Sequence, residues 1–293
     1  MFKKEKFMKA SGLDIVKKLN KSNFWLSAIA IDLLLIQIYL TWKFIGSSDT
    51  LSIKVLFWAA ILNLIWKKRY TLNLESDIVS SVFGFLLISF VLVKSSSLFW
   101  FETYFVKIYA LFSCFGLALM ASGIKGLKQY TKEFIILLLL ISEGLLISLI
   151  SSKVDFSLLA AKFSSFVLWY LGFAVSRQGV NVILPTGAIE IYPACSGLNA
   201  ILLLLQLALI FILVFPINTF QKIFLPIIAV FLAFIINVFR LVLITLLVAA
   251  SNHEGFEYWH GQPGTQIFST ISIFAFGFVC HLILQKNQQV CRN

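Results

Sequence analysis

Three residues in the C-terminal part of the chain have side chains suited to nucleophilic chemistry: Cys195, Arg240 and His260. A cysteine thiolate can attack a peptide carbonyl, a histidine can protonate the leaving amine, and an arginine can stabilise the thiolate or the developing oxyanion. Each residue type alone has common structural roles. Their joint presence on one membrane face would suit thiol-based acyl transfer.

Cys195 lies between a short segment of alternating polar and apolar residues and a continuous apolar run that begins at Leu198. We expect a helix to begin there, and the dipole and free N–H groups of a helix N-terminus favour a thiolate. Ser196, Gly197 and Asn199 are expected to bind substrate or support the site. The alternative is an inert buried cysteine, which is the commoner kind in membrane proteins.

Arg240 stands inside a long apolar segment. An arginine within a membrane span costs about 3 kcal/mol, so it usually has a function. Asn237 lies one helical turn earlier on the same face and is expected to hold the guanidinium in place. The alternative is an ion pair between helices, for which Asp32 and Glu143 are candidate partners.

The depth of Arg240 fits poorly with the other two residues. If its span begins near Leu225, Arg240 lies about 22 Å along a hydrocarbon core that is about 30 Å thick. Cys195 and His260 are expected near the membrane surface. Either the arginine reaches upward by snorkelling, or the cysteine lies in a submerged cavity.

His260 stands between aromatic residues and a Gly/Pro turn. His253 lies in the same predicted loop and remains a rival for the proton-transfer role. His281 lies near the cytoplasmic end of the last predicted span, on the wrong face. Because His260 is close to the start of that span, we expect its position to be better fixed than that of His253.

Composition predicts a polytopic membrane protein. The 293 residues are 60% hydrophobic and 13% charged, and no soluble domain of this length could bury so much apolar surface. The apolar runs are long and do not alternate, so helices are expected rather than a β-barrel. The net charge of +11 comes mostly from Lys and Arg in short loops between these runs. That positive-inside pattern argues against nucleic-acid binding.

The four cysteines show neither CxxC nor CxxxH spacing. They are Cys114, Cys195, Cys280 and Cys291. This argues against a zinc site and against a disulfide scaffold, and we expect no cofactor.

The apolar runs predict about eight membrane-spanning helices, since about 20 residues cross a bilayer. The predicted spans are 24–42, 51–66, 78–93, 104–122, 134–150, 198–215, 225–250 and 266–284. The basic loops place both termini in the cytoplasm and Cys195 on the outer face of the membrane. The predicted organisation is a cytoplasmic basic tail (1–22), a five-span region (23–150), a catalytic membrane core (151–285) and a cytoplasmic tail (286–293).

Residues 155–175 decide this topology. The segment is apolar enough to span, but Lys162, Ser164 and Ser165 interrupt it. We expect an interfacial helix on the outer face, with a ninth span as the alternative.

A short β-hairpin is predicted after this helix, immediately before Cys195. Its strands would be 181–184 and 188–191, joined by a turn at residues 185–187. The predicted fold class is therefore an all-α polytopic membrane protein with one interfacial helix and one small hairpin.

Three segments resemble the signature blocks of the exosortase/archaeosortase family. They are Ala194-Cys195-Ser196-Gly197-Leu198-Asn199-Ala200, Asn237-Val238-Phe239-Arg240 and His260-x-x-x-Gly264. The run from Trp259 to Phe268 is most similar to the cyanobacterial branch, the cyanoexosortases. The resemblance covers about residues 75–285 and is specific from about Gly179 onward.

This resemblance implies a multi-pass cysteine protease or transpeptidase of the plasma (inner) membrane. Its partners would be membrane-anchored proteins whose C-terminal sorting signal has a short Pro-Glu-Pro-like motif, a transmembrane helix and a basic tail. By the same resemblance, Cys195 would be the nucleophile, Arg240 the stabilising residue and His260 the proton-transfer residue.

Two other functions remain compatible with the sequence. A transporter or channel would use Arg240, Asp32 and Glu143 to line a polar path. A component of envelope polysaccharide export would leave Cys195 without a chemical role.

Overall fold

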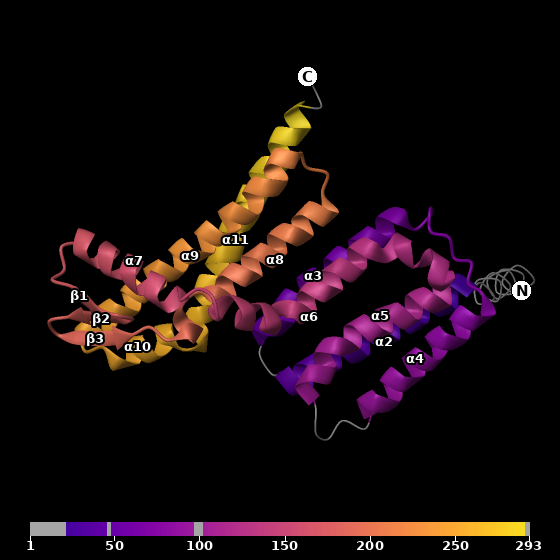
Figure 1. Ribbon diagram of the computed structural model, residues 1–293, viewed down its shortest axis with the longest axis horizontal. Helices are drawn as coiled ribbons and strands as arrows, with labels where there is room; N and C mark the ends of the chain where they lie inside the picture. The colour runs from indigo at the N-terminus through magenta and orange to yellow at the C-terminus, as the bar shows by residue number, and fades with distance from the viewer. Residues whose placement is uncertain (1–21, 46–47, 97–101, 291–293) are drawn as a thin grey trace, which may run out of the picture. The chain divides into compact units, whose positions relative to one another are not determined.

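The computed structural model of the protein describes residues 22–45, 48–96 and 102–290. Helices dominate this part of the chain, and its β structure is one three-stranded sheet (Figure 1). The chain forms two compact units, Met1–Ile141 and Ser142–Asn293. The predicted cytoplasmic basic tail lies outside the described residues, apart from Ser22.

The first unit is built from helices that follow one another along the chain. They are α2 (Ser22–Ile45), α3 (Ser48–Lys68), α4 (Ile78–Ser96), α5 (Glu102–Gly126), the 3₁₀ helix η1 (Leu127–Tyr130) and the first part of α6 (Thr131–Ser151), which continues into the second unit. The first five predicted spans each fall within one of the five α-helices.

Close packing in the first unit depends on glycine and on one ion pair. A Cβ atom at Gly84 of α4 would lie 2.6 Å from the carbonyl oxygen of Gly116 on α5. Small residues of this kind let helix backbones approach each other in a membrane. Lys68 of α3 forms a salt bridge of 2.8 Å with the buried Glu133 of α6, which supplies the partner that a buried carboxylate needs.

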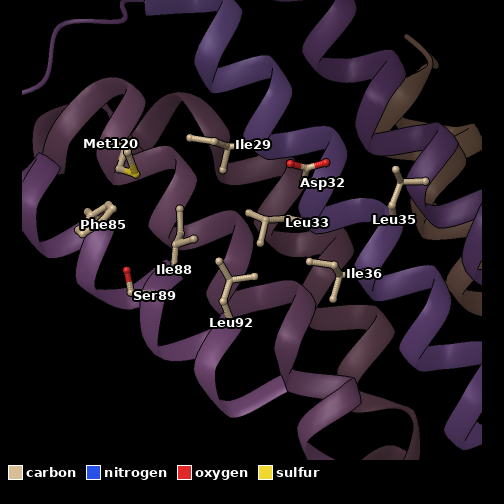
Figure 2. Close-up of a pocket in the computed structure, with 10 residues that line it drawn as sticks. All are labelled: Ile29, Asp32, Leu33, Leu35, Ile36, Phe85, Ile88, Ser89, Leu92 and Met120. Atoms are coloured by element: carbon tan, nitrogen blue, oxygen red, sulfur yellow. The ribbon is translucent and has the colours of Figure 1, made fainter. Parts of the chain in front are cut away.

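A cavity of about 370 Å³ lies between α2, α4 and α5 (Figure 2). Asp32 and Ser89 are the two polar side chains among the ten residues that line it. The other side chains, such as Leu33 and Met120, are apolar. The cavity therefore offers few groups to a polar solute.

The second unit contains the elements that carry Cys195, Arg240 and His260. These elements are α7 (Phe156–Tyr170), β1 (Ser176–Gln178), β2 (Asn181–Leu184), β3 (Gly187–Glu190), the 3₁₀ helix η2 (Pro193–Cys195), α8 (Leu198–Val214), α9 (Thr219–Ala249), α10 (His253–His260) and α11 (Gln262–Val290). The helix α7, the sheet and α10 gather around the C-terminal end of α9 (Figure 1).

The sheet confirms the predicted hairpin and adds a strand to it. The order is β1-β2-β3 with antiparallel pairing throughout, so β2 is central. The hairpin turn is shorter than predicted because β3 begins at Gly187 and pairs there with Leu184. The extra strand β1 consists of polar, exposed residues, so it has no apolar alternation by which the sequence would indicate it.

One face of the sheet packs on the helices of this unit. Val182 of β2 and Ile191 are buried in a cluster with Leu168 of α7 and Leu241 of α9, and Cys195 packs against the same cluster. Cys195 is therefore supported by a hydrophobic cluster that α7, the sheet and α9 build together.

The helix α9 is longer than the predicted seventh span, because it begins at Thr219 rather than near Leu225. Asn218 and Gln221 form a capping box at its start, a sequence signal that marks a helix N-terminus. With 31 residues, α9 is about 46 Å long.

Five segments among the described residues are long and apolar enough to cross a membrane. They are Trp25–Lys43, Ile78–Ser95, Ile108–Ser151, Thr219–Ala249 and Gln262–Gln289. The helices α7 and α8 are apolar but shorter, and the 15 residues of α7 extend only about 22 Å. A multi-pass membrane protein is thereby confirmed, whereas the number of eight spans stays a prediction.

Candidate active site

The structure brings Cys195 and His260 into contact. The Sγ atom of Cys195 lies 3.4 Å from Nε2 of His260, within hydrogen-bonding distance for sulfur. The two residues are 65 positions apart in the chain. A thiol and an imidazole at this separation can exchange a proton, which is the arrangement that activates a cysteine nucleophile.

Cys195 is held in a tight turn just before a helix. It is the last residue of η2, and its backbone N–H donates to the carbonyl oxygen of Tyr192 at 2.9 Å. Gly197 follows with a left-handed φ of 88° and forms the N-cap of α8. Cys195 therefore precedes a helix N-terminus, as predicted.

Ser196 and Asn199 have different environments around this turn. Ser196 is buried, and its hydroxyl donates to the carbonyl oxygen of Pro193 at 2.7 Å. It also accepts from the N–H of Leu198 at 3.4 Å. Ser196 therefore stabilises the turn. Asn199 is exposed on the first turn of α8.

Asn237 fixes the turn from α9. Its Nδ2 donates to the carbonyl oxygen of Cys195 at 3.1 Å, and a Cβ atom at Gly197 would lie 2.7 Å from the same Nδ2. Glycine is therefore required at position 197 both for its φ and for the close approach of Asn237. Asn237 was predicted to hold the guanidinium of Arg240. The hydrogen bonds given for that guanidinium go instead to residues of α10 and α11, and the Asn237 amide nitrogen donates to Cys195.

Arg240 binds the C-terminal end of α10. Its Nη2 donates to the carbonyl oxygen of His260 at 2.9 Å and to Oγ1 of Thr265 at 2.8 Å. Its Nε donates to the carbonyl oxygen of Trp259 at 3.4 Å. The last carbonyls of a helix lack intrahelical partners and attract a cation, so Arg240 both caps α10 and holds His260.

The ion-pair alternative for Arg240 finds no support in the second unit. Arg240 is buried with 6% of its surface exposed, and the hydrogen bonds just described go to carbonyl and hydroxyl oxygens. Glu143 belongs to the same unit but is exposed on α6. Asp32 belongs to the first unit and lines its apolar cavity.

The helix α10 explains how Arg240, which lies well inside α9, can be close to His260 and Cys195. Arg240 lies nine residues before the end of α9 at Ala249, a rise of about 13 Å. The segment 251–264 was predicted to be a loop, but its eight-residue helix α10 folds back along α9 and carries His260 down about 10 Å from His253. Cys195 lies beside Asn237, one helical turn before Arg240, so Cys195, His260 and Arg240 lie at a similar level along α9.

A model of the family described as Transmembrane exosortase (Exosortase_EpsH) matches residues 42–277 of the chain. The chain belongs to the transmembrane exosortase family. The matched range includes Cys195, Arg240 and His260. No curated protein and no solved structure matches the chain. Membership supports a membrane protease or transpeptidase of the exosortase kind, and it leaves the cyanobacterial branch undecided.

The three histidines of this exosortase family member differ in their position and contacts. His260 ends α10 beside Cys195, whereas His253 is the first residue of that helix. His281 lies within α11, where its Nε2 is 2.8 Å from Nε2 of Gln285. Only His260 among the three is in hydrogen-bonding contact with Cys195.

Two residues near His260 were not singled out from the sequence. Phe256 stacks on the His260 ring, with ring centroids 5.0 Å apart and an interplanar angle of 11°. Thr265 accepts from Arg240 and donates to the carbonyl oxygen of Gly261 at 2.9 Å. The spacing of Phe256 from His260, one helical turn, is the sequence signal that would have indicated a contact.

Gly264 allows α11 to begin directly against α10. A Cβ atom there would lie 2.2 Å from the carbonyl oxygen of Trp259, so no other residue fits without moving the backbone. This explains why the third sequence block has a glycine four positions after His260.

The site brings together groups that can take part in acyl transfer. A thiol such as that of Cys195 can act as a nucleophile, and an imidazole such as that of His260 can carry a proton. The first turn of α8 has N–H groups that lack intrahelical acceptors. Such groups can stabilise an oxyanion. Within the described ranges, no group of three or more His, Cys, Asp or Glu side chains is placed to hold a metal ion.

Proposed function

We propose that the protein is a membrane-embedded cysteine protease or transpeptidase that cleaves C-terminal sorting signals of exported proteins. The observation that carries the proposal is the 3.4 Å contact between Cys195 Sγ and His260 Nε2. Family membership supports it at the level of the reaction class.

The proposed reaction has two steps. The thiol proton of Cys195 passes to His260, and the thiolate attacks the scissile carbonyl carbon. The C–N bond then breaks as His260 gives that proton to the leaving amine, which leaves the exported part of the substrate as a thioester on Cys195. Water or an amine then attacks the thioester carbonyl, and His260 takes the proton of the attacking group. The C–S bond breaks, the acyl group leaves on the water oxygen or the amine nitrogen, and His260 returns the proton to the Cys195 thiolate.

Arg240 serves this reaction by holding His260. Its hydrogen bonds to the carbonyl oxygens of Trp259 and His260 fix the end of α10. Its positive charge also interacts with Cys195, in the sense that favours the thiolate. Asn237 fixes the backbone of Cys195 in the same way. Asn199 is exposed, as are residues 192–194 before Cys195, and these residues would contact the substrate.

The proposed substrate is an exported protein that ends in a short Pro-Glu-Pro-like motif, a transmembrane helix and a basic tail. In the proposed topology of eight spans, α7 lies on the outer membrane face and both termini are cytoplasmic. The C-terminal end of α9 then faces outward. The site would lie in the outer half of the plasma membrane, where the motif of a helix-anchored substrate would also lie. We also propose that the protein belongs to the cyanobacterial branch of the family, the cyanoexosortases.

The test is to express the protein with a tagged substrate of this kind and to compare it with Cys195→Ala. We expect the shortened substrate with the wild-type protein only. A Cys195→Ala protein that still processes the substrate would overturn the proposal.

A further inference from the structure

The strand β3, which leads to Cys195, is an edge strand of the sheet in the described part of the chain. In the order β1-β2-β3, strand β3 pairs with β2 on one side. Val182 pairs with Ile189, and the N–H of Ile191 donates to the carbonyl oxygen of Val180 at 3.2 Å. Since antiparallel partners alternate, Gly187, Ile189 and Ile191 turn their backbone polar groups toward β2.

The intervening residues Ala188 and Glu190 therefore turn their N–H and C=O groups away from β2. Both residues are exposed. An open row of backbone donors and acceptors is a template on which another extended chain can pair. The opposite edge, formed by Arg177 of β1, is open in the same sense but leads away from the nucleophile.

The path of β3 relates this edge to the reaction. A Cβ atom at Gly187 would lie 3.0 Å from Cγ1 of Val248, near the C-terminal end of α9. Cys195 lies beside Asn237, about 16 Å further back along that helix. The four residues of β3 cover about 13 Å of this distance, so β3 runs along α9 from its C-terminal end toward Cys195.

We propose that β3 binds the substrate as an added strand, pairing through Ala188 and Glu190 with the residues just N-terminal to the scissile bond. This rests on the function proposed above. A substrate anchored by a C-terminal helix enters the membrane in its N-to-C direction, and β3 runs inward in the same direction. The added strand is therefore parallel to β3.

The substrate segment that binds β3 is an extended main chain, because this edge presents mainly backbone N–H and C=O groups. Parallel and antiparallel pairs occur together in mixed sheets. The specificity for a motif would then come from side chains beside Cys195, while β3 supplies pairing that accepts many sequences.

The first test removes one outward N–H by Ala188→Pro. Proline is tolerated at a strand edge whose N–H does not join the ladder, so the β2–β3 pairing should remain. We expect cleavage of a co-expressed substrate to fall at least tenfold. The matched control is Arg177→Pro, which makes the same change at the opposite edge and should stay within about twofold of wild type. Wild-type cleavage by Ala188→Pro would overturn the proposal.

A cross-linking scan decides the matter even if Ala188→Pro does not fold. Cysteine is placed at Ala188 or at Glu190 in a chain whose own cysteines are replaced, and single cysteines are placed along the substrate before the scissile bond. We expect disulfides at every second substrate position, since neighbouring side chains of a strand alternate between faces. The partner of Glu190→Cys should lie two residues nearer the scissile bond than that of Ala188→Cys. Cross-links without alternation, or a shift in the opposite direction, would overturn the proposal.

The two proposals fail separately. Cleavage by Cys195→Ala would overturn the protease assignment whatever the edge does. Cleavage that depends on Cys195 but is unaffected by Ala188→Pro would overturn only the added strand.

Discussion

Arg240 donates from Nη2 to the main-chain oxygen of His260 at 2.9 Å. A buried guanidinium on one long helix thus fixes the residue that meets Cys195. An arginine at this position was expected to act on the thiolate or the oxyanion directly. The geometry gives it a positioning role in addition, because the carbonyl that it binds belongs to the histidine itself.

Arg240→Lys should reduce substrate cleavage at least tenfold, because lysine is a point charge that lacks the planar fork of donors that arginine uses here. If Arg240 acts by placing His260, the same change in a His260→Ala background should have little further effect. The measurement is a double-mutant cycle on the cleavage rate. Fully additive losses in this cycle would refute the positioning role.

His260→Ala should lower cleavage by about 10²-fold or more, the usual contribution of a general acid–base residue. His253→Ala is the natural control, since it removes an imidazole from the other end of α10. We expect that variant to stay close to wild type in the same time course. The reverse pattern would mean that the proton-transfer residue is His253.

Asn237→Asp tests the hydrogen bond to the Cys195 carbonyl. An ionised carboxylate cannot donate to that oxygen, whereas a protonated one can. The cleavage rate of the variant relative to wild type should therefore be low near neutral pH and rise as the pH is lowered. Asn252→Asp is the control, because the side chain of Asn252 accepts from the N–H of Gly255 and a carboxylate can do the same. A ratio for Asn237→Asp that does not change with pH would contradict this role.

Gly197→Ala should be more damaging than Gly172→Ala, although the two residues have nearly the same φ of 88° and 89°. A left-handed alanine costs about 1–2 kcal/mol at either position. At Gly197 the new methyl group also meets the Asn237 side chain, whereas nothing lies within 4 Å at Gly172. Thermal unfolding in detergent and substrate cleavage should both show the difference. Equal effects at the two positions would mean that the contact with Asn237 is not what requires glycine at position 197.

Much of the helical framework could be predicted from hydrophobic runs, because membrane helices must be long and apolar. The beginning of α9 was placed too late, near Leu225, although the capping box of Asn218 and Gln221 marks the start of the helix. The helix α10 has only eight residues, which is too short for a hydrophobic period to be recognised in the sequence. It is stabilised by Asn252 at its start and by Arg240 at its end, and the second of these contacts exists only in the folded protein.

The three candidate catalytic residues could be named from their types and surroundings, but their geometry could not. The depth of Arg240 was a difficulty as long as residues 251–264 were taken for an extended loop. Because α10 folds back along α9, His260 lies beside Arg240 and is also in contact with Cys195. The role of Gly197 depends likewise on its contact with Asn237, 40 residues further along the chain.

The most direct test of the central claim is mass spectrometry of the acid-quenched enzyme after expression with its substrate. The account predicts a covalent adduct on the peptide that contains Cys195, with the mass of the cleaved substrate acyl group and released by hydroxylamine. If the enzyme cleaves its substrate without such an adduct at any time point, and if Cys195→Ser cleaves as fast as wild type, Cys195 is not the nucleophile.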